Sequence, residues 1–562
     1  MQNGIETKFH IEDKSLWSGA RLLELRAETH RDKVFLQFED EESVTFLEMN
    51  ERTNRVARGL ASLGVSKGDT VLTMLPGSLE NHYVWFATQK LGAVWVPVHT
   101  AYKGYFLEHV ANVCKAKILV VDEQFLDRIA FSLPNLHYLE KTIVRTKQGF
   151  KGDAFGLEQK LQGVPFERLY EHSSSNVEVE INYLDPSAIM FTSGTTGASK
   201  GILLSQAYTH VISETVTNLL RLTEGDIFYI SFPPYHGMGA QATVYPCLVM
   251  GAKAVIYEWF SASRWIDDVR KSGATAAALV GAMMDFVFRQ PEKPTDSENN
   301  LRVIWAVPRP HAIYEAFKKR FHVEAILDSY AQTETNIVLI SPYDEYRPNS
   351  AGKRISNLYE LRVADPITDE ELPPNQLGEL LVRSKVPWAM SGGYFGMPEK
   401  TGECWRNGWW HTGDGLTVDE EGYYHFQDRL KDAIRRRGEN ISSQEIEGII
   451  NEHPAIEESA IVAVKAAHHG GEDEVKACIV LNAGYSVSPE ELVQWCEGRI
   501  PYFAIPRYIE FIDQLPKTPT AKIRKQELRE HGITQGTWDR EKAGYKLKEE
   551  ALKKKRKSAN DT

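Results

Sequence analysis

The sequence predicts an α/β fold: a large N-terminal domain of layered sheets and helices, followed by a small C-terminal α+β domain. Short apolar runs alternate with amphipathic helical patterns along the first half, which is typical of sheets covered by helices. The texture changes between residues 423 and 438, where a charged run begins. The 562 residues suffice for several structural units, and 42% hydrophobic residues are an ordinary share for a globular protein.

The alternation begins in the N-terminal domain at Phe46. A helix with Val56 and Leu60 on one face is expected to end at Gly64, and a second helix is expected near Tyr83–Leu91. Apolar, β-branched runs between and after these helices predict strands. The predicted strands are Val71–Leu75, Ala93–Val98, Ala116–Val121, Ala188–Phe191, Ile227–Phe232, Ala252–Tyr257 and Thr275–Val280.

The change of texture marks the expected domain boundary. A short strand at Tyr424–Phe426 precedes the charged run, and Ser442–Glu445 beyond it has the spacing of a capping box that opens a helix ending near Pro454. The lysine-rich end favours a solvated, flexible tail over a localisation or lipid-binding signal. The predicted units are an N-terminal domain at 1–428, a C-terminal domain at 429–535, which the resemblance described below implies to be mobile, and a basic tail at 536–562.

Charge and composition exclude several classes of protein. The 65 basic and 77 acidic residues give a net charge of −12, which is the wrong sign for a protein that mainly binds nucleic acid. No apolar run approaches the ~18–20 residues of a membrane helix, and the N-terminus lacks a signal-peptide pattern. The five cysteines form no CxxC pair, so reduced, mostly buried thiols are expected. We therefore expect a cytoplasmic protein without stable membrane insertion; assembly into a homo-oligomer stays open.

The densest chemical signal is Phe191–Gly201, FTSGTTGASKG, which directly follows an apolar strand. Glycines let backbone amides approach an anion closely, while hydroxyls and one lysine add donors to phosphate oxygens. The segment is not a Walker A loop, because Ser199 and Gly201 flank Lys200 where that loop needs Gly before and Ser or Thr after the lysine. A phosphate-binding loop is favoured over a plain flexible turn.

This loop resembles the (Y/F)TSGTTGxPKG motif of the adenylate-forming superfamily, which includes acyl-CoA synthetases, firefly luciferase and the adenylation domains of peptide synthetases. Further segments resemble the family's motifs in the same order over nearly the whole chain. The hinge region, with Asp428-Arg429 and Arg437–Ser442, looks most like the crotonobetaine/carnitine-CoA ligase branch. The matching segments are Gly64–Asp69, Leu91–Pro97, Pro233–Gly237, Tyr330–Glu334, Trp409–Asp414, Asp428–Asp432, Arg437–Asn440 and Pro516–Lys522.

The resemblance implies a nucleotide site whose parts also make chemical sense, since activating a carboxylate needs ATP, a divalent cation and a positioned positive charge. Glu334 and Thr196 would ligate Mg²⁺, Asp414 would accept from the ribose hydroxyls, and Lys522 would bridge acid and phosphate oxygens. The implied catalytic residues are Lys522, His236, Lys200 and Glu334. The implied ATP/AMP-binding residues are Thr192, Ser193, Gly194, Thr195, Thr196, Gly197, Lys200, Tyr330, Ala331, Gln332, Thr333, Asp414, Arg429 and Lys522.

The resemblance also implies two conformations that share one site. Lys431 would be the hinge about which the small domain swings, withdrawing Lys522 and presenting a CoA-binding segment, Gly438, Glu439 and Asn440. His236 is expected to line the pocket and position its contents, because a carboxylate is already ionised near neutral pH and needs no general base.

The acid is expected to bind in a short pocket with bulky walls, which favours a small or medium acid over a long straight chain. If the acid carries a trimethylammonium group, Trp305 or Tyr235 would face it, with Asp285 as a counter-charge. Plain core packing of these aromatic residues is the alternative. The implied acyl-pocket residues are Tyr235, Gln241, Gly281, Met284, Asp285, Trp305 and Pro308.

Several positions depart from the family pattern without removing a charged group. The phosphate-loop proline is Ser199, two motif glycines are Ala331 and Ala521, and Ala306–Pro310 replaces a GGAPL-like loop, which leaves the placement of the base open. The function expected from the resemblance is an ATP-dependent, AMP-forming acid–CoA ligase that uses ATP, Mg²⁺ and coenzyme A. The alternatives are an adenylation enzyme that loads a carrier-protein phosphopantetheine and a non-catalytic nucleotide-binding protein; a luciferase-like oxygenase is disfavoured.

Overall fold

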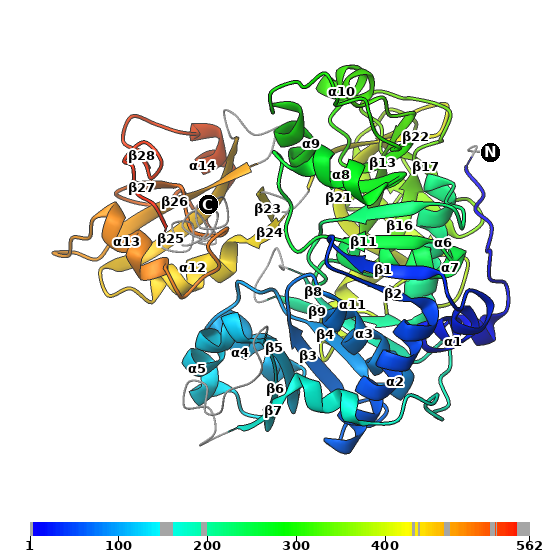
Figure 1. Cartoon of the computed structure of the whole chain (residues 1–562). Coiled ribbons are helices and arrows are strands. Elements are labelled where there is room, and N and C mark those ends of the chain that lie inside the picture. Colours follow the sequence, from blue (N-terminus) through cyan, green and yellow to red (C-terminus); the bar gives the residue numbers. More distant parts are fainter. Residues whose placement is uncertain are drawn as a thin grey trace.

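A seven-stranded sheet carries both flanks of the predicted phosphate loop (Figure 1). The computed structural model describes residues 4–146, 161–192, 199–429, 433–436, 439–465, 473–517, 523 and 525–547. The sheet is parallel except for its last pair, in which Thr192 lies opposite Lys200. In pairing order its strands are β7 (Gln162–Pro165), β6 (Lys141–Arg145), β5 (Ile118–Asp122), β3 (Thr70–Met74), β4 (Val94–Pro97), β8 (Pro186–Thr192) and β9 (Lys200–Ser205).

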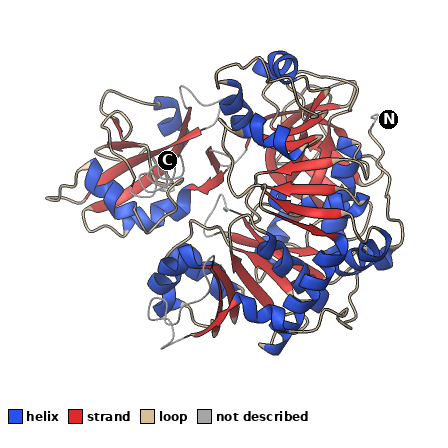
Figure 2. Ribbon diagram, viewed as in Figure 1, coloured by secondary structure: helices blue, strands red, loops and turns tan. Residues whose placement is uncertain are grey.

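A second seven-stranded sheet lies beside the first and is also parallel apart from one edge pair (Figure 2). Both sheets are apolar and buried because helices cover them. In pairing order its strands are β14 (Ala325–Leu327), β13 (Val303–Val307), β12 (Ala276–Val280), β10 (Ile227–Ile230), β11 (Lys253–Ile256), β1 (Val34–Phe38) and β2 (Glu42–Thr45). The predicted α/β class and the positions of the seven strands predicted between Val71 and Val280 are confirmed, and the predicted strand at Tyr424–Phe426 lies within β22 (Tyr423–Arg429).

The two predicted N-terminal helices are confirmed as α2 and α3. Helix α2 begins with a capping box between Thr45 and Glu48, and it ends two residues before Gly64, whose φ of 100° suits glycine. The helices of this part of the chain are α1 (Gly19–Thr29), α2 (Phe46–Ser62), α3 (Leu79–Leu91), α4 (Tyr105–Val113), α5 (Leu126–Ser132), α6 (Gln206–Leu220), α7 (Val244–Met250), α8 (Trp265–Ser272), α9 (Gly281–Phe288), α10 (Tyr314–Phe321) and α11 (Pro398–Cys404).

A third, antiparallel sheet, which the sequence did not predict as a unit, brings together segments from 329 to 429. It places the Tyr330–Glu334 motif and the Trp409–Asp414 motif on strands of one sheet. In pairing order its strands are β15 (Ser329–Gln332), β16 (Asn336–Ile340), β17 (Gly352–Arg354), β22 (Tyr423–Arg429), β21 (Trp409–Val418), β19 (Gly378–Ser384) and β18 (Tyr359–Ala364), with β20 (Trp405–Arg406) beside β21.

The small C-terminal domain lies to one side of the large one in Figure 1, coloured from yellow through orange to red. Its apolar core reaches Leu547, which is 1% exposed, so the chain packs beyond the predicted start of the flexible tail at residue 536. The predicted helix before Pro454 is confirmed as α12. The elements of the small domain are β23 (Ala433–Arg436), β24 (Glu439–Ser442), α12 (Ser443–Asn451), β25 (Ile456–Lys465), β26 (Asp473–Leu481), α13 (Pro489–Cys496), β27 (Tyr508–Phe511), α14 (Lys525–His531) and β28 (Trp538–Asp539).

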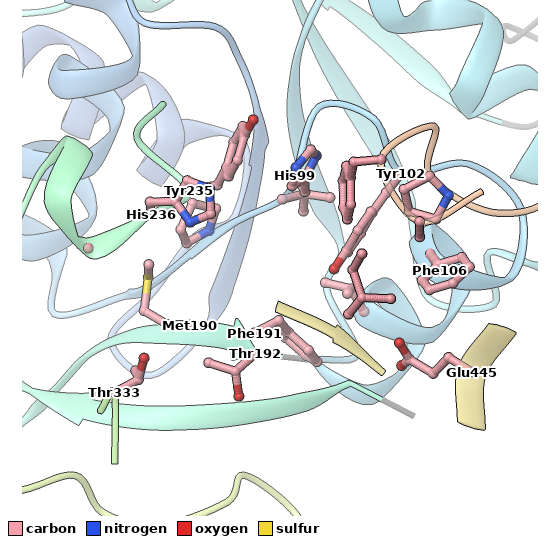
Figure 3. A pocket seen from close by; sticks show the side chains of 18 of the residues that line it. His99, Tyr102, Phe106, Met190, Phe191, Thr192, Tyr235, His236, Thr333 and Glu445 are labelled. Atoms are coloured by element: carbon pink, nitrogen blue, oxygen red, sulfur yellow. The ribbon is translucent and has the colours of Figure 1, made fainter. Parts of the chain in front are cut away.

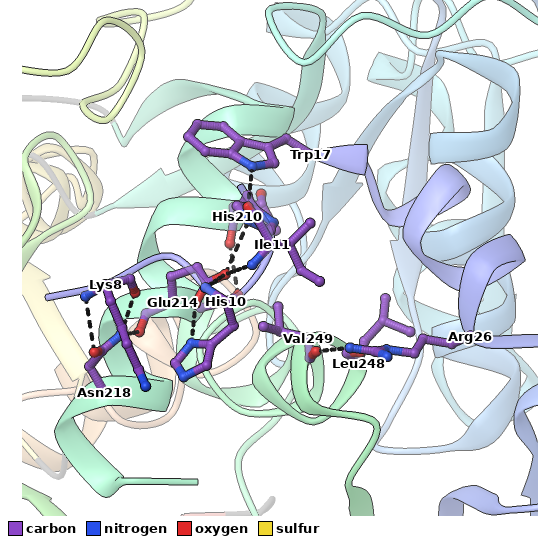
Figure 4. A network of polar contacts seen from close by, with 12 residues as sticks. Lys8, His10, Ile11, Trp17, Arg26, His210, Glu214, Asn218, Leu248 and Val249 are labelled. Atoms are coloured by element: carbon purple, nitrogen blue, oxygen red, sulfur yellow. Dashed lines mark hydrogen bonds and ion pairs between the residues drawn. The ribbon is translucent and has the colours of Figure 1, made fainter. Parts of the chain in front are cut away.

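The extended N-terminal segment is held against α6 by one buried carboxylate (Figure 4). Glu214 accepts hydrogen bonds from the backbone N–H groups of His10 and Ile11, and its other oxygen lies 2.7 Å from Nδ1 of His10. Burial alone would raise the pKa of Glu214, but its hydrogen bonds with His10 and His210 outweigh burial and lower the pKa to about 2. Glu214 is therefore ionised at neutral pH and fixes the segment.

Two expectations about the whole chain can be compared with the structure. All five cysteines are free thiols, and four of them are buried, as predicted. Among the described residues, no helix has the length and apolar character needed to cross a membrane.

Candidate active site

A cavity of about 160 Å³ lies between the two domains, and side chains from both form its wall (Figure 3). The large domain contributes Thr192 at the end of β8 and Thr333 after β15. The small domain contributes Glu445 from α12 and Phe503 from the loop before β27. The cavity therefore joins the flank of the predicted phosphate loop to the small domain.

The predicted pocket residue His236 lines this cavity together with Tyr235. Next to them lies His99, which no sequence motif had indicated. The His99 ring lies 4.2 Å from the Tyr235 ring and 4.9 Å from the Phe503 ring, measured between centroids. Nδ1 of His99 accepts a hydrogen bond from the backbone N–H of Ala101, which leaves Nε2 as the protonated nitrogen of the neutral ring. His99 thus links the two domains.

Glu445 reaches across the domain interface to Ser199, at the end of the predicted phosphate loop. Burial raises the pKa of its carboxyl to about 8, and a hydrogen bond from the backbone N–H of Ser199 opposes that shift only in part. The carbonyl oxygen of the same Ser199 lies 2.7 Å from Nε2 of His109, on α4. The backbone of Ser199, next to Lys200, is therefore held by His109 of the large domain at its carbonyl and by Glu445 of the small domain at its N–H.

Asp414, the predicted ribose ligand, is buried and fixed by two other predicted residues. The Tyr330 hydroxyl donates to its Oδ2 at 2.7 Å, and Nε2 of Gln332 donates to the same oxygen at 2.8 Å. Arg429 lies opposite Asp414 in the β21–β22 pair, which places its backbone beside the ribose candidate as the resemblance implies. Tyr330 and Gln332, two predicted nucleotide-binding residues, thus hold the carboxylate of a third, Asp414, in place.

Lys200 and Glu334, the predicted phosphate and metal ligands, share a neighbour, Tyr394. The Lys200 ammonium lies 4.5 Å from the centroid of the Tyr394 ring, and the Tyr394 hydroxyl donates to Oε1 of Glu334 at 3.1 Å. Sequence analysis did not single out Tyr394, since it lies outside the motifs quoted for the resemblance. Ala331, within the Tyr330–Glu334 motif, is exposed on β15.

A magnesium ion fits this part of the site only with help from a substrate. Within the described part of the chain no three His, Cys, Asp or Glu side chains gather as a metal cluster. Mg²⁺ is commonly bound by one or two carboxylates together with substrate phosphates, and the Glu334 carboxylate, near the phosphate-loop lysine, suits that arrangement.

The seven predicted acyl-pocket residues lie on several elements of the large domain, among them α9 and β13. Of the seven, only Tyr235 is among the residues that line the described cavity. Trp305 is buried and donates from Nε1 to Oγ of Ser329 at 3.0 Å, and Asp285 pairs with Arg289 at 2.6 Å. Met284 and Gln241 are buried in the large domain, while a side chain at Gly281 would collide with the carbonyl oxygen of Pro308. Asp285 as a counter-charge for a cationic acid would have to compete with Arg289.

Several predicted site residues lie outside the described part of the structure. For Arg429, Glu439 and Asn440 the backbone alone is described. The predicted site residues that lie outside the described part of the structure are Ser193, Gly194, Thr195, Thr196, Gly197, Lys431, Gly438 and Lys522.

The arrangement of these motifs agrees with a comparison against known families. The family model described as "AMP-binding enzyme" matches residues 23–395. The chain belongs to this family. The model of the AMP-binding enzyme C-terminal domain matches residues 445–522, within the small domain. As an AMP-binding enzyme, the chain has a fold in which the nucleotide motifs and the small domain face one cavity.

Individual relatives of the chain include CoA ligases and CoA synthetases. The chain is 30% identical to crotonobetaine/carnitine–CoA ligase of Salmonella paratyphi A, over 90% of this chain and 97% of that one. Among solved structures it is similar to o-succinylbenzoate CoA synthetase of Bacillus subtilis, with a TM-score of 0.78, 23% identity and coverage of 92% and 99%. It is also similar to ATP-bound MatB of Rhodopseudomonas palustris, with a TM-score of 0.64, 26% identity and coverage of 91% and 98%. This AMP-binding enzyme is an AMP-forming acyl-CoA synthetase.

Proposed function

We propose that the enzyme activates a small or medium carboxylic acid with ATP and transfers it to coenzyme A. The observation that carries the proposal is the cavity between the domains. Thr192 and Thr333 of the nucleotide motifs and Glu445 and Phe503 of the small domain line one space. A thiol entering beside the small domain would therefore meet an acyl group held beside the nucleotide.

In the first half-reaction, a carboxylate oxygen attacks the α-phosphorus of ATP, and the bond to pyrophosphate breaks. The carboxylate needs no base because it is ionised at neutral pH. Lys200 would hold the terminal phosphates and Asp414 the ribose, with Tyr330 and Gln332 keeping the Asp414 carboxylate in place. A bound Mg²⁺, held by Glu334 and the phosphates, would neutralise negative charge there. Lys522 is proposed to bridge the acid and the α-phosphate.

In the second half-reaction, the CoA thiolate attacks the acyl carbonyl, and the bond between that carbon and the phosphate oxygen breaks. The thioester forms and AMP leaves. The small domain is proposed to swing about Lys431 between the two steps, which would withdraw Lys522 and bring Gly438, Glu439 and Asn440 to the thiol. Contacts of His99 with Tyr235 and Phe503 support a role for domain docking in this step.

The compact-acid proposal rests on the bulky residues near the cavity, Tyr235 and His236 in particular. Each methylene that such a site cannot accommodate forfeits ~0.8 kcal/mol of burial energy. The relative at 30% identity is named for betaine acids, so carnitine and crotonobetaine belong among the candidates. The free thiols suit the reducing cytoplasm, which is the compartment we propose.

The test is acid-dependent exchange of pyrophosphate into ATP with carnitine, crotonobetaine, butyrate, benzoate, a larger ring-bearing acid and palmitate. We expect exchange with one or more of the compact acids, and AMP release that depends on CoA. Palmitate as the best acid would contradict the compact pocket. Exchange followed by transfer only to a carrier-protein phosphopantetheine would contradict CoA as the acceptor, and no exchange with any acid, although ATP binds, would favour a nucleotide-binding protein.

A further inference from the structure

Tyr394 touches both charged residues on the phosphate side of the site. Its ring lies under the Lys200 ammonium at 4.5 Å, and its hydroxyl donates to Oε1 of Glu334 at 3.1 Å. The Tyr394 hydroxyl is the donor of this hydrogen bond, and the Glu334 carboxylate is the acceptor. One neutral side chain therefore contacts a cation with its face and an anion with its edge.

The backbone around Tyr394 is fixed on two sides. The N–H of Ser391 donates to the carbonyl of Glu334 at 3.0 Å, while Gly392, Gly393 and Phe395 exchange hydrogen bonds with β9. Tyr394 itself lies opposite Ile202, and its N–H donates to Oγ1 of Thr401 at 2.9 Å. The segment 391–395 thus ties the turn of Glu334 to the strand of Lys200.

We propose that Tyr394 is a positioning residue that sets Glu334 and Lys200 relative to each other for a metal-bound triphosphate. The inference rests on the proposed function, because it takes Glu334 as a metal ligand and Lys200 as a phosphate ligand. The hydroxyl orients the Glu334 carboxylate, as partners of metal ligands do, and the ring face holds the Lys200 ammonium in place. The two contacts can be removed separately.

The experiment measures ATP binding by calorimetry, with Mg²⁺ and in EDTA, for the unaltered enzyme, Tyr394→Phe and Tyr394→Leu. Tyr394→Phe keeps the ring over Lys200 but loses the hydroxyl, so ATP binding with Mg²⁺ should weaken about 10-fold while binding in EDTA is nearly unchanged. Tyr394→Leu also removes the ring, so binding in EDTA should weaken about 3- to 10-fold. Tyr245→Phe, which removes another buried hydroxyl far from these contacts in sequence, is the control.

Equal binding by Tyr394→Phe and the control, with Mg²⁺ and in EDTA, would overturn the proposal even if the leucine variant fails to fold. A similar loss for the phenylalanine variant with and without Mg²⁺ would also overturn it, because only the metal-dependent part involves Glu334. The proposed function fails separately, if the unaltered enzyme does not bind ATP at all.

Discussion

The hydroxyl of Tyr330 donates a 2.7 Å hydrogen bond to Oδ2 of Asp414, although 84 positions separate the two residues. The antiparallel sheet makes this contact, since β15 and β21 both belong to it. Gln332, two residues after Tyr330, donates to the same oxygen. Two donors on one strand therefore orient the carboxylate proposed to bind ribose.

Tyr330→Phe should raise the KM for ATP by about 10-fold or more, because a hydrogen bond to a charged group contributes ~1.5–3 kcal/mol. The KM for CoA should stay the same. Gln332→Leu should raise the KM for ATP by a smaller factor. The free-energy cost in the double variant should be smaller than the sum of the two single costs, since both donors share one oxygen. Equal increases in the KM values for ATP and for CoA would contradict a role through Asp414.

Much of this arrangement could be predicted from the sequence, but only where local patterns carry it. The runs at Val71–Leu75 and Ala188–Phe191 have the apolar character of buried strands, and both are strands in the structure. The motifs predicted Asp414 and Gln332, but not that Gln332 supports Asp414, because that contact depends on strand pairing.

Other features depend on how distant segments meet. His99 and Phe503 pack ring against ring across the domain interface, and nothing near either residue indicates the other. The lysine-rich composition around Leu547 predicted a solvated tail, yet the Leu547 side chain is buried in the core of the small domain. The composition of a segment predicts whether most of its residues are exposed, but one buried apolar side chain can still hold the segment against the core.

Replacement of Glu445 should alter the pH dependence of domain docking. The docked carboxyl has a pKa of about 8, whereas an exposed glutamate has one near 4.5, so the docked state holds a proton that the open state releases. Docking is therefore favoured at low pH and is lost as the pH rises from about 4.5 through about 8. Energy transfer between fluorescent labels on the two domains measures this change. Glu445→Gln should remove most of the pH dependence, and Glu452→Gln, at an exposed position just after α12, should keep it.

Replacement of Glu214 should loosen the N-terminal segment at neutral pH. The lowered pKa, about 2 against an ordinary 4.5, corresponds to ~3 kcal/mol of stabilisation that is present above about pH 4.5 and lost as the pH falls through about 2. Glu214→Gln should therefore speed hydrogen exchange in residues 4–17 near pH 7, and the difference from the unaltered chain should shrink in acid. Glu224→Gln, whose side chain is 72% exposed, serves as the control. A difference that persists at pH 2 would contradict the electrostatic explanation.

Truncation of Phe503 should affect the second half-reaction more than the first. Its ring lines the cavity from the small domain and packs on His99, so Phe503→Ala removes an interface contact without touching the nucleotide motifs. We expect thioester formation from synthetic acyl-adenylate to slow by about 10-fold, since aromatic pairs add ~0.5–1.5 kcal/mol beyond their buried area. Pyrophosphate exchange should change little. Phe131→Ala, at a ring that is 55% exposed, is the matched control, and a comparable loss of exchange in Phe503→Ala would contradict the assignment.

The pairing of segment 391–395 with β9 also bears on solubility. Strand β9 ends the order of its sheet, and an uncovered end strand offers a row of backbone groups to a neighbouring molecule. Gly392, Gly393 and Phe395 take up hydrogen bonds of Gly201 and Leu203, so part of that row is already used within the chain. At the opposite end, β7 is short and finishes at Pro165, which cannot donate. Both margins of the sheet that carries the phosphate loop therefore resist edge-to-edge aggregation.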